Sequence, residues 1–207
     1  MHKISENQTI VGVIDCTGHG VPGAFMSLVG FNLLNAIVIE SKIFDPAQIL
    51  EELSKRIVIA LKQDVNSNHD GMDVVLCKID DSDANTPSVV FAAAKRPLFV
   101  YDSTNRVVNK INGSKRLIGG IGRHKDSFEN HIINLHKNDV LYLTTDGYSD
   151  QNDPKRARMT VEKMSEIMLE NAEKGMSIQK EVFYTFFKEY KDTSEQRDDV
   201  TIVGIKL

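Results

Sequence analysis

The sequence has few of the features that mark disulfide-rich, secreted or membrane-spanning proteins. It contains no tryptophan and only two cysteines, Cys16 and Cys77, each inside an apolar run. Two such cysteines do not make a disulfide framework, and buried thiols are typical of a reducing compartment. We count no run of the roughly 20 apolar residues that span a membrane, and no signal peptide. We therefore expect a cytoplasmic domain without direct membrane contact, in a parent chain that could itself be anchored.

A dense basic surface is also missing. The 25 lysine and arginine residues are outnumbered by 29 aspartate and glutamate residues, which gives a formal net charge of -4. Because binding to nucleic acid depends on clustered positive charge, we expect no nucleic-acid partner. The motif G-x-x-x-x-G-K-[ST] of P-loop nucleotide-binding proteins does not occur either.

The hydrophobic pattern that is present predicts an α+β fold with large antiparallel sheets. The predicted elements, in chain order, are a strand at residues 9–15, helices at 22–40 and 45–61, an antiparallel meander of short strands within 72–146, helices at 160–172 and 177–190, and a strand at 199–207. Strands and helices come in groups rather than in strict alternation, which excludes a fold of repeated β-α-β units.

Three glycines, Gly18, Gly20 and Gly23, have the G-x-G-x-x-G spacing of a dinucleotide-binding fingerprint. That fingerprint needs a second parallel strand with an acidic residue at its end. Glu40 stands at nearly the right distance, but it ends one predicted helix and precedes another. Asp15, at the end of the strand, would repel a diphosphate. We therefore interpret the glycines as a sharp strand-to-helix turn.

Two further sites have a structural and a functional interpretation. His19, inside the glycine turn, is interpreted as a structural residue that bonds to backbone carbonyls, and a catalytic role is the alternative. Lys95 and Arg96, in "AAAKRPL", are interpreted as exposed hairpin charges, and contact with a phosphoprotein is the alternative.

Aspartates border three of the β-rich runs: Asp15 follows "TIVGVI", Asp146 follows "VLYLTT", and Asp198 with Asp199 precedes "VTIVGI". Aspartate is a poor strand former and is costly to leave unpaired near a core, so these positions need a cation or hydrogen bonds. Oxygen ligands without clustered His or Cys favour Mg²⁺ or Mn²⁺. Two such ions about 3.5–4 Å apart activate water for phosphoryl transfer. Ordinary turn aspartates remain the alternative at this point.

Five segments occur in a family's order and spacing: "DCTGHGVPGAFMS", "MDVVLCKID", "FAAAKRPLFVY", "LYLTTDGYSDQND" and "QRDDVTIVGIKL". From about Ile10 to the C-terminus the chain resembles the bacterial metal-dependent serine/threonine phosphatases of the stage II sporulation protein E and sigma-factor-regulator type. These are relatives of the type 2C protein phosphatases. The resemblance implies a β-sandwich of two mainly antiparallel sheets flanked by helices.

The resemblance also implies a site. Asp15 matches the aspartate that bridges two metal ions, and Cys16 matches the position whose backbone carbonyl binds one of them. Asp146 and Asp198 match the carboxylates on the second metal, and Asp199 lies beside them. We expect Asp15, Asp146 and Asp198 to be the catalytic residues, and all five to form the site for two Mn²⁺ or Mg²⁺ ions. The turn glycines and Gly147 would let the chain pass close to these carboxylates.

One family motif is not found in this sequence. Members carry an earlier strand with G-D-[FY], whose aspartate binds the first metal. We therefore expect residues 1–207 to form a single phosphatase domain that lacks its first metal-binding strand motif, with weak binding of the first metal and low activity.

The implied function is hydrolysis of a phosphoserine or phosphothreonine regulatory protein, such as an anti-sigma-factor antagonist, by a metal-activated water in bacterial signal transduction. The implied partners are this phosphoprotein and an N-terminal sensory or regulatory domain of the parent chain, and a homodimer is left open. The helices at residues 22–40 and 45–61 would pass a signal to Asp15, or would simply be buried against the sheet. A catalytically silent phosphatase fold that acts by binding partners is the competing hypothesis.

Overall fold

The computed structural model describes residues 1–18, 20–66, 68–83, 86–120 and 126–207. The chain forms two compact units. The first unit consists of Met1–Asp83, Pro87–Pro97 and Asn112–Asn134, and the second of Ala84–Thr86, Leu98–Ile111 and Leu135–Leu207. Each unit contains an antiparallel sheet with helices, so the predicted α+β class is confirmed. The expectation of a single phosphatase domain over residues 1–207 stays a prediction.

The sheet of the first unit has the strand order β1-β2-β3-β4-β8, and β7 pairs with the start of β3. Its strands are β1 (His2–Lys3), β2 (Gln8–Cys16), β3 (Gly71–Asp80), β4 (Ser88–Ala94), β7 (Ile118–Gly119) and β8 (His131–Asn134). All of the pairings are antiparallel. The longest joins β2 to β3, from Gln8 opposite Asp80 to Cys16 opposite Met72.

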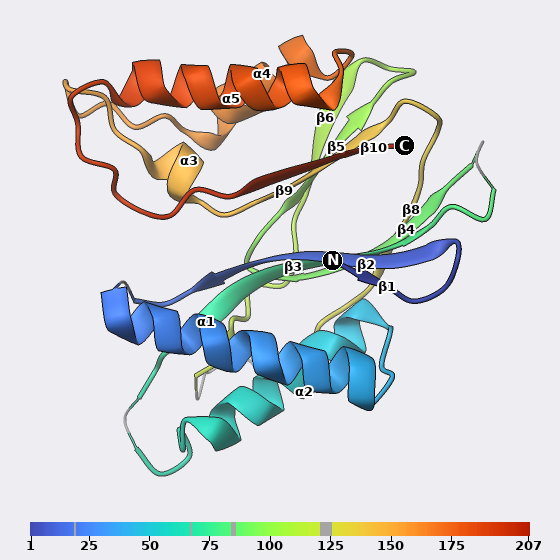
Figure 1. Ribbon diagram of the computed structural model, residues 1–207, viewed down its shortest axis with the longest axis vertical. Helices are drawn as coiled ribbons and strands as arrows, with labels where there is room; N and C mark the ends of the chain where they lie inside the picture. Colours follow the sequence, from blue (N-terminus) through green and yellow to red (C-terminus); the bar gives the residue numbers. More distant parts are fainter. Residues whose placement is uncertain (19, 67, 84–85, 121–125) are drawn as a thin grey trace. The chain divides into compact units, whose positions relative to one another are not determined.

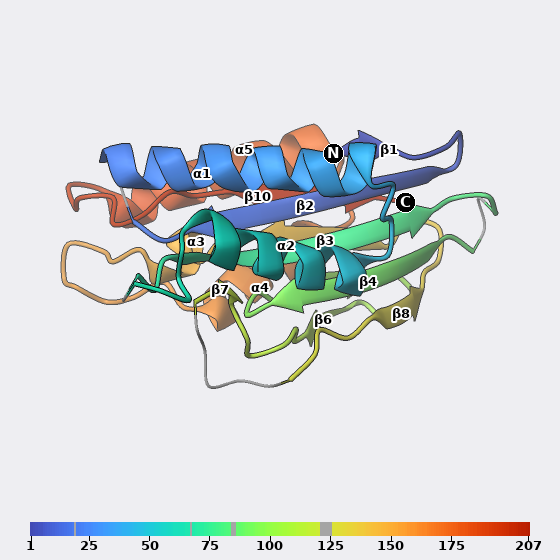
Figure 2. The ribbon, with the colours of Figure 1, turned by 90° about the horizontal axis from the view of Figure 1, so that it is seen from below.

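Helices cover one face of this sheet (Figures 1 and 2). They are α1 (Gly20–Asn35), the π-helical turn η1 (Ala36–Glu40) and α2 (Pro46–Ala60). In α2 the residues Ile49, Leu50, Leu53 and Ile57 recur at helical spacing and have no exposed surface. They pack in one cluster with the helix-side residues of β3 and β4. Burial of each such side chain contributes roughly 1.5–3 kcal/mol, which holds the helix on the sheet.

One face of α1 packs in the same cluster, but its other face is apolar and exposed. Val21, Phe25, Leu28 and Phe31 are between 55% and 69% exposed. Among the described residues, Gly20–Glu40 is one helix that is long and apolar enough to cross a membrane by length and composition alone. The expectation that no segment of this kind is present is therefore wrong, because the polar residues that interrupt the run in the sequence are too few to make the helix polar.

The sheet of the second unit has the strand order β10-β9-β5-β6, and its pairings are all antiparallel. The elements of this unit are β5 (Leu98–Asp102), β6 (Val107–Ile111), β9 (Val140–Thr144), α3 (Gly147–Asp150), α4 (Val161–Asn171), α5 (Met176–Lys191) and β10 (Ile202–Lys206). Helices α4 and α5 cover one face of the sheet (Figure 1). There the rings of Tyr148 and Phe183 meet edge to face with centroids 5.7 Å apart.

The middle of the chain does not form the single meander that its pattern predicts. β3 and β4 pair in the first sheet, whereas β5 pairs with β6 and β9 in the second. The residues between β4 and β5 explain the change. Lys95 has a φ of +60°, and Pro97 has no N–H to donate. A regular hairpin ladder does not continue through these residues, so β5 finds another partner.

The N-terminus of α2 is capped by Asp45. One oxygen of Asp45 accepts a hydrogen bond from the Gln48 N–H at 2.9 Å, and the other accepts one from the Asn130 side-chain amide at 2.6 Å. Asp45→Ala removes both bonds, so we expect urea denaturation to show a free energy of unfolding lower by about 1–2 kcal/mol. The exposed Asp64 lies beyond the other end of the same helix, and Asp64→Ala should change it by less than about 0.5 kcal/mol. Equal losses in the two variants would contradict the capping role.

Candidate metal centre

Asp15 lies near the end of β2, on the face of the sheet turned away from α1 and α2. Its neighbours Ile14 and Cys16 pack with the helix-side cluster, and successive side chains of a strand alternate between faces. Asp15 stands opposite Asp73 of β3 in the register, and Cβ atoms of such pairs are about 4.5–5.5 Å apart. Two aspartates therefore lie side by side at this end of the sheet.

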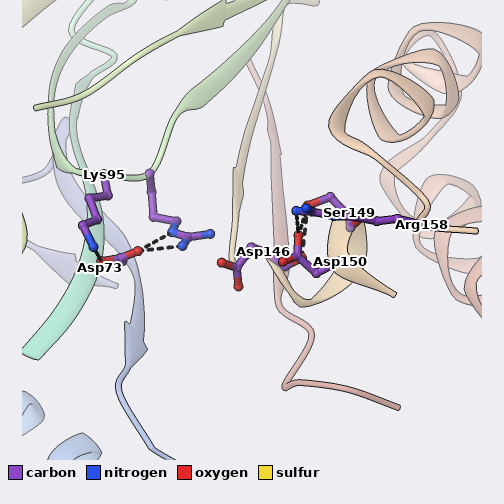
Figure 3. Close-up of polar contacts among 7 residues, drawn as sticks. Asp73, Lys95, Asp146, Ser149, Asp150 and Arg158 are labelled. Atoms are coloured by element: carbon purple, nitrogen blue, oxygen red, sulfur yellow. Dashed lines mark hydrogen bonds and ion pairs between the residues drawn. The ribbon is translucent and has the colours of Figure 1, made fainter. Parts of the chain in front are cut away.

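Asp73 is paired with two cations. Arg96 donates to Asp73 Oδ2 from Nε at 3.1 Å and from Nη2 at 2.6 Å. Lys95 Nζ lies 3.8 Å from Asp73 Oδ1 (Figure 3). The Arg96 side chain is only 15% exposed, so its interpretation as an exposed hairpin charge is wrong. Asp73 is not among the site residues predicted from the motifs, although it breaks the apolar run "GMDVVLC" as Asp15 ends "TIVGVID".

The turn after Asp15 is tied to the start of β3. The Thr17 N–H donates to the Gly71 carbonyl at 3.0 Å, and the Gly71 N–H donates to Thr17 Oγ1 at 3.0 Å. The Thr17 hydroxyl also donates to Asp70 Oδ1 at 3.3 Å. These bonds set the direction in which the chain leaves the sheet beside Asp15.

The three glycines of this turn form a sharp strand-to-helix connection, as their spacing predicts. Gly18 has a φ of +92° and Gly20 a φ of +64°, in the left-handed region that favours glycine. A Cβ on Gly23 would lie only 2.6 Å from the Gly18 carbonyl oxygen. His19, interpreted as a structural residue, lies outside the described residues.

The side chain of Cys16 lies on the face opposite to Asp15, partly buried against the helix-side cluster. Burial raises the pKa of its thiol; a hydrogen bond with Ser27 opposes this rise, and the charge of Asp15 adds to it. The thiol is therefore directed away from the Asp15 carboxylate, and only the backbone carbonyl of Cys16 is a candidate ligand on that side.

In the second unit, Asp146 lies between the end of β9 and the start of α3. Before it, the Thr145 N–H donates to the Thr201 carbonyl at 3.1 Å, and the Thr201 N–H donates to Thr145 Oγ1 at 3.0 Å. After it, Gly147 has no room for a side chain, because a Cβ would overlap the Asp199 carbonyl oxygen. The close passage of the chain that we expect at Gly147 is present, and it brings the backbone of Asp199 beside this turn.

Asp198 and Asp199 are exposed in the segment before β10. The Asp199 N–H donates to Asp198 Oδ1 at 2.8 Å, and Gln196 Nε2 donates to the Asp198 carbonyl at 2.9 Å. The Thr145 hydroxyl donates to the Asp199 carbonyl at 3.1 Å. The strand-end turn and the segment before β10 are therefore joined at one corner of the second unit.

Another aspartate near this turn, Asp150 at the end of α3, is engaged elsewhere. Asp150 forms an ion pair with Arg158 (Figure 3). The Ser149 hydroxyl donates to the Asp146 carbonyl at 3.1 Å, which closes the first turn of α3. Asp150 is thus part of the local structure of this helix, and it offers a comparison for Asp146.

The predicted metal-site residues belong to both units: Asp15 and Cys16 lie in the first, and Asp146, Asp198 and Asp199 in the second. Within the described part of the chain, no three His, Cys, Asp or Glu side chains form a group that could hold a metal ion. The donors at both places are nevertheless oxygen atoms at strand ends, the type that Mg²⁺ and Mn²⁺ take. The assignment of these residues as metal-binding and catalytic stays a prediction.

A comparison with protein families matches residues 5–207 to the family described as Stage II sporulation protein E (SpoIIE). This match covers nearly the whole chain and agrees with the resemblance carried by the motifs. No curated protein matches the sequence.

Several solved structures share the fold. The SiaA-PP2C domain of Pseudomonas aeruginosa is 26% identical, with a TM-score of 0.87 over 100% of this chain and 79% of that chain. The PP2C phosphatase domain of SpoIIE from Bacillus subtilis, with a fragment of its regulatory domain, is 19% identical, with a TM-score of 0.76 over 100% of this chain and 55% of that one. RsbX in complex with magnesium is 15% identical, with a TM-score of 0.61 over 98% and 82%. The last two likenesses show the fold alone.

The close approach at Gly147 can be tested by adding one methyl group. Gly147→Ala forces the Asp199 segment to move, so we expect urea denaturation to show a loss of roughly 1–3 kcal/mol in the free energy of unfolding. Gly175 is the matched control, because nothing lies within 4 Å of a Cβ built there. If Gly147→Ala were as stable as Gly175→Ala, the tight contact between these two segments would be refuted.

Proposed function

The chain belongs to the stage II sporulation protein E family, and from this premise we propose that it is a metal-dependent protein serine/threonine phosphatase domain. Its fold is that of PP2C-type phosphatase domains. The substrate class that we propose is a bacterial regulatory phosphoprotein, such as an anti-sigma-factor antagonist, that carries phosphoserine or phosphothreonine.

The observation that carries this proposal is the close approach of Asp199 to Gly147. It joins the "TTDG" turn to the "RDDVT" segment, although the two are far apart in the sequence. A purely structural contact between these two segments would not require an aspartate next to it in each segment, as Asp146 and Asp198 are. The arrangement supports Asp146 and Asp198 as the metal ligands that the second unit contributes.

Bound Mg²⁺ or Mn²⁺ would supply the positive charge and the activated water that hydrolysis of a phosphoester needs. The residues that would hold two such ions are Asp15, the backbone carbonyl of Cys16, Asp146 and Asp198. The Asp199 N–H, bonded to Asp198 Oδ1, would orient that carboxylate. A related fold, RsbX, was solved in complex with magnesium, which supports this choice of ion.

A regulatory partner is the second part of the proposal. The exposed apolar face of α1, which includes Phe25 and Phe31, begins directly after the turn that holds Asp15. A sensory or regulatory domain of the parent chain, or a second copy of this one, would bury this face and act on that turn. The SpoIIE structure similar to this chain includes a fragment of that protein's regulatory domain, which supports such a partner.

The central test is Mn²⁺-dependent phosphate release from a phosphoserine peptide, measured together with Mn²⁺ affinity by calorimetry. Asp146→Asn should weaken Mn²⁺ binding and lower turnover by more than the roughly 10–100-fold that loss of an outer-sphere partner costs. Chelation of the metal should abolish turnover in the unaltered chain.

Asp150→Asn is the matched control, because Asp150 ends the short helix that follows Asp146 and forms an ion pair with Arg158. It should retain turnover. Phosphate release that continues after chelation, or that survives Asp146→Asn, is incompatible with the proposed chemistry. Metal binding without any turnover would instead favour the catalytically silent signalling module.

The role of α1 can be separated from its packing, because the side chains to be changed are exposed. Phe25→Ser combined with Phe31→Ser should leave the free energy of unfolding within about 1 kcal/mol. In the parent chain, however, it should change Mn²⁺ affinity or turnover. Ile178→Ser, which alters an exposed residue of α5, serves as the control. A double variant with unchanged metal affinity and unchanged turnover would argue against signal transfer through this face.

A further inference from the structure

The turn that carries Lys95 and Arg96 is a strained γ-turn. The Arg96 N–H donates to the Ala94 carbonyl at 2.8 Å, and Lys95, between them, has a φ of +60°. A γ-turn with positive φ at its central residue is rare and strained. Such strain persists where the surrounding structure enforces it, and strained positions cluster at ligand-binding sites.

The neighbouring backbone of the first unit enforces this turn. The Lys95 N–H donates to the Ser114 carbonyl at 2.7 Å, and the Ser114 N–H donates to the Ala93 carbonyl at 2.9 Å. A Cβ on Gly113 would lie 2.6 Å from the Ala93 Cβ, so glycine is what allows this approach. These contacts thus brace the turn, and they fix the directions of the Cα–Cβ bonds of Lys95 and Arg96.

Both cations reach Asp73 on the neighbouring strand, and Figure 3 shows Lys95 beside it. The two hydrogen bonds from Arg96 to one carboxylate oxygen hold the plane of the guanidinium and therefore the direction of its N–H groups. The Lys95 side chain is 44% exposed and accessible to a ligand. Asp73 stands directly opposite Asp15, one strand spacing of about 4.8 Å away.

We propose that Lys95 and Arg96 bind the phosphoryl group of the substrate beside Asp15, and that Asp73 is the positioning residue for the Arg96 guanidinium. This inference rests on the proposed function and adds two substrate-binding residues that the aspartate motifs do not include. A structural ion pair with Asp73 needs only one cation, and the side chain of the second cation, Lys95, is 44% exposed.

The chemistry of the two side chains suits a phosphate monoester. Such a group carries close to two negative charges and has three acceptor oxygens. A guanidinium matches two of these oxygens with parallel N–H groups, whereas a flexible ammonium adds charge without fixed geometry. Arg96 would therefore orient the phosphoryl group, and Lys95 would strengthen its binding.

The test uses the 207-residue chain and two measurements. The first is binding of inorganic phosphate without added metal, followed by NMR titration, and the second is Mn²⁺-dependent turnover of a phosphoserine peptide. Arg96→Ala should weaken phosphate binding by roughly 10-fold or more and raise KM more than it lowers kcat. Lys95→Gly should also weaken binding, but its Tm should be equal or higher, because glycine adopts the positive φ without strain.

Two further variants serve as controls. Arg56→Ala removes a partly buried arginine that is paired with Glu52 on α2, and it should leave phosphate binding unchanged. Arg96→Lys keeps the charge beside Asp73 and so protects the fold if the alanine variant is unstable. It should bind phosphate more weakly than the unaltered chain, because lysine lacks the planar fork.

The outcomes separate this inference from the proposed function. The inference is overturned if the unaltered chain, Arg96→Lys and Lys95→Gly bind phosphate equally well. It is also overturned if the variants lower the Tm but leave phosphate binding unchanged. Normal turnover in all variants supports the proposed phosphatase function and overturns the inference. Phosphate binding that is lost with Arg96, in a chain without Mn²⁺-dependent turnover, sustains the inference and overturns the proposed function.

Discussion

The antiparallel pairing of β2 with β3 is the constraint on which the first unit depends. Its nine register pairs run from Gln8 opposite Asp80 to Cys16 opposite Met72. This register decides which side chains of β2 meet the helices and which meet the other face. A slip of one residue would turn Asp15 toward the apolar helix side. The same register sets Asp15 beside Asp73, and through Asp73 it engages the braced turn of Lys95 and Arg96.

The two units use the same local device to present a carboxylate. In each, an aspartate stands at or just after the end of a strand, and glycine follows where the chain must turn sharply or pass close to another segment. Gly18 permits the left-handed turn after Asp15, and Gly147 admits the Asp199 backbone after Asp146. The family match over residues 5–207 and the PP2C-type fold of the solved structures give these two turns their chemical interpretation.

Elements determined by local signals were predicted well. The helix α2 was expected at residues 45–61 and is found at Pro46–Ala60, because its cap, its proline and its apolar spacing all lie within it. The short strands β1 and β7 were not expected, since they exist only through pairing with β2 and β3. The single meander was wrong for a related reason: the partner of β5 is chosen by the strained turn at Lys95 and by the availability of β9, not by its own sequence.

By itself the sequence determined the α+β class, most helices and strands, and the candidate carboxylates, because apolar periodicity and aspartates that interrupt it are local properties. Only the tertiary structure decided which residues those carboxylates meet. The pairing of Asp73 with Arg96 depends on strand register and on the brace at Gly113, and the contact of Gly147 with Asp199 depends on how distant segments pack. Such contacts cannot be predicted from periodicity, because the residues that they join are far apart in the sequence and have no regular spacing.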